Sequence, residues 1–87
     1  MDKIKEHVEA GRLDEAIVLL EQKKADNPND AEVLYELGCV YWKKQDWKHC
    51  LDCYAEAVSL DPGSPASEAR KMVLDILQFY NKEMFNV

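Results

Sequence analysis

Apolar residues recur along the chain with the spacing of an α-helix. In residues 13–28, and again in residues 47–62, they follow i, i+3, i+4 and i+7, which places them on one helical face. When the chain is displaced by 34 residues these two segments superpose, and Pro28 meets Pro62. A proline cannot continue a helix, so both copies are expected to end there. A fixed period of this size predicts stacked supersecondary units.

The segments that flank the two copies have the same period. The stretch "NDAEVLYELGCVYWKK" carries one broad apolar face, formed by Val33, Leu34, Leu37, Tyr41 and Trp42. Ahead of the first copy, Ile4, His7 and Val8 share one side of a short segment that Gly11 ends. After Pro62 a longer segment carries an apolar stripe, predicted as Ala69, Met72, Val73, Ile76 and Tyr80. All three segments are therefore also predicted to be helical.

Residue types before these segments indicate where the helices begin. Asn29 with Glu32 three residues later fits a capping box, Asp46 is a suitable cap for the next helix, and Ser64 followed by Pro65 suits the last. Loops of two to five residues would place consecutive helices antiparallel. The predicted fold is all-α, a stack of antiparallel helical hairpins. It has five helices, over residues 2–10, 12–25, 30–44, 46–60 and 65–84.

The unit centred on the second copy resembles a tetratricopeptide repeat (TPR). That family's pattern, W-x2-L-G-x2-Y, then A-x3-F, then P, is met at Leu34, Leu37, Gly38, Tyr41, Cys50, Tyr54 and Pro62. Leu34, Cys50 and Tyr54 stand where the family has tryptophan, alanine and phenylalanine. The resemblance implies a right-handed α-solenoid in a single domain over residues 1–87. Residues 1–28 would be a partial first repeat, 29–62 a full repeat and 63–87 a C-terminal capping helix, as in small stand-alone bacterial TPR proteins.

Composition narrows the class of protein. Hydrophobic residues make up 47% of the chain, which is ample for a packed core. No apolar run approaches the roughly 20 residues that span a bilayer, and the charged N-terminal stretch lacks the apolar segment of a secretory signal. Three cysteines, an odd number, argue against a disulfide framework. We therefore expect a cytoplasmic protein that has no membrane partner.

The net charge of −6 opposes nucleic-acid binding, because affinity for phosphates comes from lysine and arginine. The stretch "YWKKQDWK" is a local exception, in which Trp42 and Trp47 alternate with lysines and could stack bases. A solvated helix end with both rings packed inward is the stronger interpretation. No nucleic-acid partner is expected.

The stretch "HCLDCYAEA" raises the alternative of a metal or thiol-redox site. His49, Cys50 and Cys53 supply at most three of the four ligands of a zinc site. A thioredoxin-like motif places its first cysteine at a helix N-terminus, whereas this pair lies inside a predicted helix. Cys50 aligns with Ala16 of the other copy, where a small side chain suits a close helix crossing. We predict that these cysteines pack in the core, with no metal, no cofactor and no catalytic residues, so the protein is not an enzyme.

The TPR resemblance implies a protein or peptide ligand on a concave face lined by the first helix of each repeat. The implied partner-binding residues are Lys5, Val8, Glu9, Tyr35, Cys39, Trp42, Lys43, Arg70, Leu74 and Leu77. Aromatic contacts would come from Trp42 and Tyr35, and the basic side chains would meet carboxylates. Cys39 stands where the chaperone-binding members have a clamp asparagine, so that specific function is not expected. The alternative is a shallow groove in which Trp42 only covers the last helix.

A second hypothesis is homodimerisation through the last helix. Two and a half repeats fall short of the three that stacks generally need. This helix carries more apolar side chains than one hairpin buries, namely Leu74, Leu77, Phe79, Met84 and Phe85. A second copy would cover them, or the end of the chain would fold back over its own groove.

Overall fold

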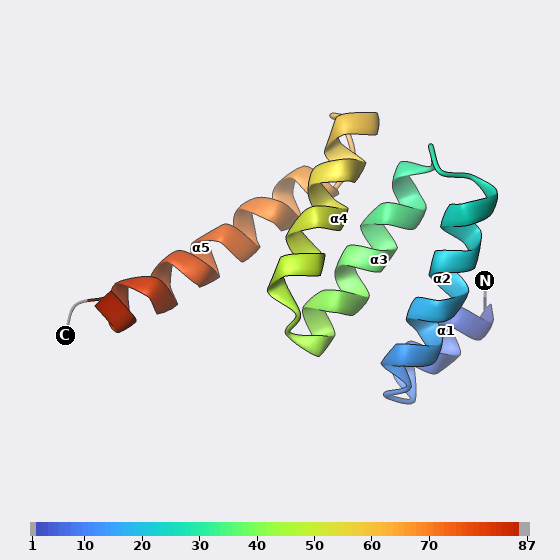
Figure 1. Ribbon diagram of the computed structural model, residues 1–87, viewed down its shortest axis with the longest axis horizontal. Helices are drawn as coiled ribbons and strands as arrows, with labels where there is room; N and C mark the ends of the chain where they lie inside the picture. Colours follow the sequence, from blue (N-terminus) through green and yellow to red (C-terminus); the bar gives the residue numbers. More distant parts are fainter. Residues whose placement is uncertain (1, 86–87) are drawn as a thin grey trace.

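The computed structural model describes the backbone of residues 2–85 and the side chains of residues 3–79. Within the described residues the chain forms five helices and no strand, and each helix packs on its neighbours in the sequence (Figure 1). They are α1 (Asp2–Glu9), α2 (Leu13–Asp26), α3 (Ala31–Lys44), α4 (Trp47–Leu60) and α5 (Ala66–Phe85). The predicted all-α fold is confirmed, and every helix boundary lies within one residue of its prediction.

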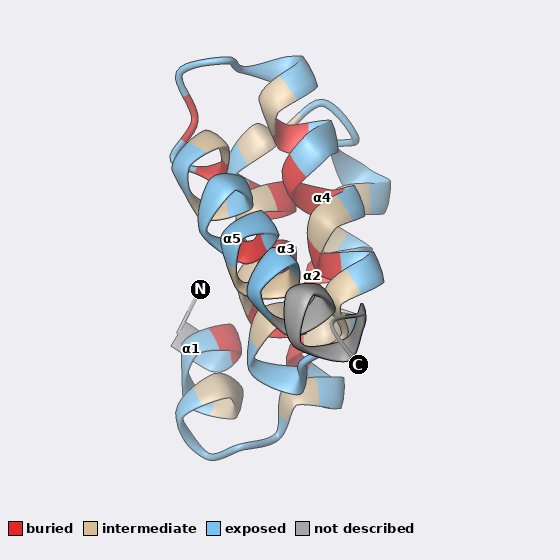
Figure 2. Cartoon of the chain, turned by 90° about the vertical axis from the view of Figure 1, so that its left-hand side faces the viewer, coloured by how far each residue is buried: buried red, intermediate tan, exposed pale blue. Residues whose placement is uncertain are grey.

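The helices form two layers, with α1, α3 and α5 on one side and α2 and α4 on the other (Figures 1 and 2). The molecule is a slab of 45 × 30 × 16 Å. Two ion pairs at the surface link α2 to the helices after it. Lys44 Nζ of α3 lies 2.6 Å from Asp14 Oδ1, and Lys24 Nζ lies 3.8 Å from Glu56 Oε1 of α4. No helix in the described part combines the length and the apolar character needed to cross a bilayer.

The start of α3 differs from the prediction. Asp30, and not Asn29, caps this helix, because the Asp30 carboxylate accepts a hydrogen bond of 3.0 Å from the Glu32 amide. The Asp30 backbone is extended, with φ −94° and ψ 101°, so the first helical residue follows it directly. Asn29 lies one residue too early to reach these amides, and the predicted capping box was therefore wrong.

The caps of the last two helices are as predicted. The Asp46 carboxylate accepts hydrogen bonds from the His49 amide, at 3.3 Å, and from the His49 ring, at 2.8 Å. The Ser64 hydroxyl accepts a hydrogen bond of 3.1 Å from the Ala66 amide, and Pro65 directly precedes α5. These side chains satisfy amides that have no partner inside the helix.

The core consists of two clusters, one on each side of α3 and α4. The first gathers buried side chains from α1 to α4: Ile4, Ala16, Leu20, Val33, Leu37, Val40 and Cys53. The second joins α3, α4 and α5: Leu34, Cys50, Tyr54, Ala57, Ala66 and Val73. Ala16 and Cys50, which the repeat aligns, are both fully buried. Cys50 is thus a core residue, as its small size predicted.

The crossing of α3 and α4 depends on Gly38. A β-carbon built at this position would overlap the ring of Tyr54, which is itself fully buried. The absent side chain lets the ring of α4 lie against the backbone of α3. Gly38 and Tyr54, which stand at the glycine and phenylalanine positions of the TPR pattern, therefore contact each other directly in this chain.

The buried face of α5 differs from the predicted stripe. Ala66 and Val73 are fully buried and Ala69 and Leu77 pack beside them, whereas Met72 is 55% exposed. The predicted place of Met72 in the stripe was wrong, because α5 packs on α4 along one narrow face at i, i+3, i+7 and i+11. The side chains of Tyr80, Met84 and Phe85, which earlier predictions also used, lie outside the described residues.

Candidate partner-binding face

A hollow of about 300 Å³ lies between α1 and α3, and we call it the α1–α3 hollow. Its walls are mostly apolar, with charged side chains at the rim. The residues that line it are Ile4, Lys5, Val8, Leu20, Glu36, Cys39, Val40 and Lys43. Its volume is at the lower end of the range for ligand pockets, about 300–1,000 Å³.

A second hollow, of about 340 Å³, lies between α3 and α5, and we call it the α3–α5 hollow. Aromatic rings and small or flexible side chains line it: Tyr35, Cys39, Trp42, Lys43, Tyr54, Ala69 and Met72. Both hollows share Cys39 and Lys43. The two hollows therefore adjoin along α3, on the side of the slab that carries α1 and α5, and we call them together the depression.

Aromatic packing holds the floor of the α3–α5 hollow in place. Trp42 makes edge-to-face contacts with Trp47 and Tyr54, with ring centroids 6.2 and 6.5 Å apart, and Tyr35 stacks on Tyr54 at 5.9 Å. The Tyr54 hydroxyl donates a hydrogen bond of 3.4 Å to Cys39 Sγ. Tyr35, Cys39 and Trp42 remain partly exposed. They therefore present a preorganised surface, which lowers the entropy lost when a ligand binds.

The structure brings most of the predicted partner-binding residues to this depression. Those that line it are Lys5, Val8, Tyr35, Cys39, Trp42 and Lys43. Leu77 packs against the second core cluster instead, while Glu9, Arg70 and Leu74 are exposed and line neither hollow. Two lining residues were not among those predicted, because Glu36 was not singled out and Met72 was expected in the core. Helical spacing could have found both, since Glu36 lies three residues before Cys39 and Met72 three residues after Ala69.

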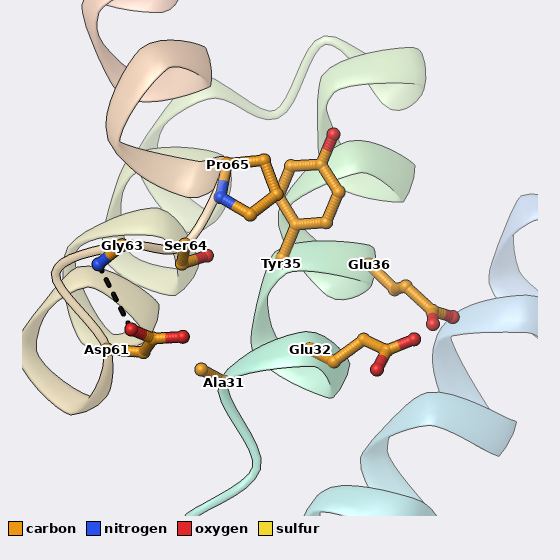
Figure 3. Close-up of a pocket in the computed structure, with 8 residues that line it drawn as sticks. All are labelled: Ala31, Glu32, Tyr35, Glu36, Asp61, Gly63, Ser64 and Pro65. Atoms are coloured by element: carbon orange, nitrogen blue, oxygen red, sulfur yellow. Dashed lines mark hydrogen bonds between the residues drawn. The ribbon is translucent and has the colours of Figure 1, made fainter.

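A third cavity, of about 390 Å³, lies between the first turns of α3 and the loop from α4 to α5 (Figure 3). We call it the acidic cavity, and it is lined by Ala31, Glu32, Tyr35, Glu36, Asp61, Gly63, Ser64 and Pro65. Partial burial and the neighbouring charge of Glu32 raise the pKa of Glu36, although Lys23 of α2 acts in the opposite direction. The Asp61 carboxylate accepts a hydrogen bond of 3.0 Å from the Gly63 amide, which fixes the loop.

The cysteines show the features of core residues. Burial raises the pKa of the Cys50 thiol to about 11 and that of Cys53 to about 12. Thiol exchange uses the thiolate, so burial lowers the reactivity of both thiols. All three cysteines are free, and no group of three or more potential ligands that could hold a metal ion occurs among the described residues.

Comparison with known proteins agrees with the repeat geometry. A sequence model of the tetratricopeptide repeat matches residues 31–64, which hold α3, α4 and the loop after them. The fold is similar to the solution NMR structure of Bacteroides fragilis protein BF1650, with a TM-score of 0.85 and 43% sequence identity. That match covers 98% of this chain and 87% of the other. The chain belongs to the tetratricopeptide repeat family. No curated protein matches it.

TPR proteins in general are non-enzymatic scaffolds, and their repeats serve as protein–protein interaction modules. Family membership therefore suggests protein partners. In this TPR chain, α3 and α4 form the matched repeat, and the depression lies along its first helix.

Proposed function

We propose that this TPR protein is a non-enzymatic module that binds a peptide or protein segment in the depression between α1, α3 and α5. The observation that carries this proposal is the pair of adjoining hollows that share Cys39 and Lys43. An extended segment lying along α3 would contact both. Trp42 and Tyr35 supply rigid aromatic surface, the kind of contact that dominates binding energy at interfaces.

Two lysines add positive charge at the rim of the depression. Lys5 and Lys43 are exposed and border the α1–α3 hollow. No described acidic side chain lies within 4 Å of either ammonium group. They are placed to meet a carboxylate of the bound segment. The proposed binding surface therefore retains Lys5 and Lys43 from the sequence-based set and adds Glu36 and Met72.

A pull-down from a cell extract tests the proposal with charge-matched variants. The groove variant is Lys5→Glu with Lys43→Glu, and the control is Lys48→Glu with Lys71→Glu, whose positions are exposed and line neither hollow. Both variants change the net charge equally. We expect partners that wild type and control retain to be lost, at least about fivefold, from the groove variant. Equal retention by both variants would refute the assignment of the depression as the binding surface.

We also propose that the chain is one structural unit. Residues 1–28 form a partial repeat, 29–62 a full repeat, and 63–87 a capping helix that covers the second core cluster. Support comes from the contact of α2 with α3 and the two surface ion pairs, which link the halves. We propose no nucleic-acid partner, because the net charge of −6 disfavours binding to phosphates.

A second candidate function is self-association through α5. Met72, Leu74 and Phe79 of this helix are 55%, 40% and 63% exposed. Such a set of large apolar side chains on one helix favours contact with another apolar surface. At about 100° per residue, Met72 and Phe79 share one side of α5 and Leu74 lies on the other. A homodimer paired through the first side would bury Met72 and Phe79, and it would place the second copy beside the α3–α5 hollow, which Met72 lines.

A further inference from the structure

Charge is unevenly distributed along the depression. Glu32 and Glu36 lie on the first half of α3, Cys39 and Val40 form an apolar floor in the middle, and Lys43 lies near the end. At a rise of about 1.5 Å per residue, Glu36 and Lys43 are separated by about 10 Å along the helix axis. A ligand lying along α3 therefore meets negative charge at one end and positive charge at the other.

The acidic cavity shares a lining residue with each hollow. Glu36 lines the acidic cavity and the α1–α3 hollow, and Tyr35 lines the acidic cavity and the α3–α5 hollow. Glu32 and Glu36 project from the same side of α3, toward α2 (Figure 3). Among the side chains of residues 3–79, no cation lies within 4 Å of either carboxylate. Lys23 is near enough to influence Glu36 but makes no ion pair with it.

We infer that the bound segment carries an apolar side chain that enters the α1–α3 hollow and a lysine or arginine that reaches the carboxylates of Glu32 and Glu36. This inference rests on the proposed function and specifies the chemistry of its partner. The apolar floor at Cys39 and Val40 lies about 10–12 Å from Glu32 along α3. An extended segment advances about 3.3 Å per residue, so its basic and apolar residues are three or four positions apart.

Complementary charge selects this occupant over an acidic segment. An acidic side chain near the first half of α3 would be repelled by Glu32 and Glu36, which project from the same side of this helix (Figure 3). Arginine fits best, because its planar guanidinium can bond two carboxylate oxygens. The opposite end of the segment would meet Lys43, where a carboxylate is favoured.

Selection of random linear 12-residue peptides displayed on phage, against the immobilised full chain, tests this inference. We expect enriched peptides to share a lysine or arginine three or four positions from a large apolar residue. Their synthetic, fluorescein-labelled forms should bind a Glu32→Gln, Glu36→Gln variant about five- to tenfold more weakly than wild type, by fluorescence anisotropy. A Glu15→Gln, Glu21→Gln variant, altered equally in charge on exposed positions of α2, should bind as wild type does.

Chemical-shift mapping on the 15N-labelled chain separates this inference from the proposed function. Some peptides could shift the amide resonances of Val8, Cys39 and Val40 and yet lack a basic residue, or bind the Glu32→Gln, Glu36→Gln variant as tightly as wild type. Such peptides would overturn the inference and leave the proposed function standing. Shifts confined to α2 and α4 would overturn both. Failure to enrich any peptide would overturn the inference alone, since the pull-down tests the proposed function independently.

Discussion

Gly38 and Tyr54 show how one pair of residues fixes the distance between two helices. The ring of Tyr54 occupies the space that any larger side chain at position 38 would need. The same ring stacks on Tyr35 and supports Trp42, and its hydroxyl bonds Cys39. Packing inside the repeat therefore also positions the floor of the depression, so a change at Gly38 would disturb both.

Replacing Gly38 with alanine should destabilise the protein by about 1–2 kcal/mol. Alanine gains about 1 kcal/mol in helix propensity, but its β-carbon would overlap a fully buried ring, so the cost of overpacking lies at the upper end of the usual range, about 2–3 kcal/mol. Denaturant unfolding followed by circular dichroism measures the difference. Gly63→Ala is the matched control, because its β-carbon would meet only Asp61 Oδ1, at 3.4 Å, and should change stability by less than about 0.5 kcal/mol. Equal effects of the two variants would contradict the proposed crossing.

The three thiols should differ in reactivity in the native protein. Cys39 is partly exposed on the floor of the depression, whereas Cys50 and Cys53 are buried and burial raises their pKa to about 11 and about 12. Because the thiolate reacts, a pKa two units above 9 lowers the rate about 100-fold below pH 9, before restricted access is counted. Titration with an aromatic disulfide reagent should show one fast thiol, followed by two more on unfolding. The fast phase should vanish in Cys39→Ala, and its persistence there would refute the assignment.

At the scale of the helices, the sequence predicted some features well and others poorly, for physical reasons. The periodicity of apolar residues predicted α2, α3 and α4 correctly. Each of these helices packs against the helix before it and the helix after it, so its apolar residues repeat regularly along the buried side. The cap of α3 was misplaced because Asn29 and Asp30 are both good caps, and only the backbone path selects Asp30. The face of α5 was misjudged because apolar residues surround this helix, so their pattern leaves open which of them meet α4.

The orientation of α5 can be tested by two substitutions that differ by one position. Val73 is fully buried in the second core cluster, so Val73→Ala should cost about 2 kcal/mol through lost burial and the cavity left behind. Met72 is 55% exposed, and Met72→Ala should cost less than about 0.5 kcal/mol. Thermal or denaturant unfolding measures both. A loss at Met72 as large as that at Val73 would mean that α5 packs through the originally predicted stripe, which holds both residues.

At the scale of the whole molecule, the stacking followed from the 34-residue displacement, but the shape of the candidate site did not. Lys5, Cys39 and Lys43 could be assigned to one face from helical spacing and the family's architecture. Side-chain packing between segments distant in sequence divides that face into separate hollows. The same packing brings Glu36 and the loop at Asp61 to one cavity. Sequence periodicity carries no information about such gaps.

Cooperative unfolding would support the single structural unit. Trp42 and Trp47 pack against the second core cluster, so their fluorescence reports on α3, α4 and α5, whereas far-ultraviolet circular dichroism reports on every helix. Because α2 contacts α3 and ion pairs link the halves, we expect the two signals to change at the same denaturant concentration. A circular dichroism transition that precedes the fluorescence transition would mean that residues 1–28 unfold separately.

Self-association is the last prediction, and it is linked to ligand binding through Met72. If α5 pairs with a second copy, sedimentation equilibrium between about 1 and 100 μM should show an apparent mass that rises above the monomer's 10.0 kDa. Met72→Glu should return the mass to that of the monomer, because it would bury a charge in the contact, whereas Val18→Glu, at a position of α2 that is equally exposed, should leave association intact. Because Met72 belongs both to the exposed set and to the α3–α5 hollow, a groove-bound peptide should weaken the dimer, and dimerisation should weaken peptide binding by the same factor. A mass of 10.0 kDa at every concentration would remove the dimer and leave the hollow open to a ligand alone.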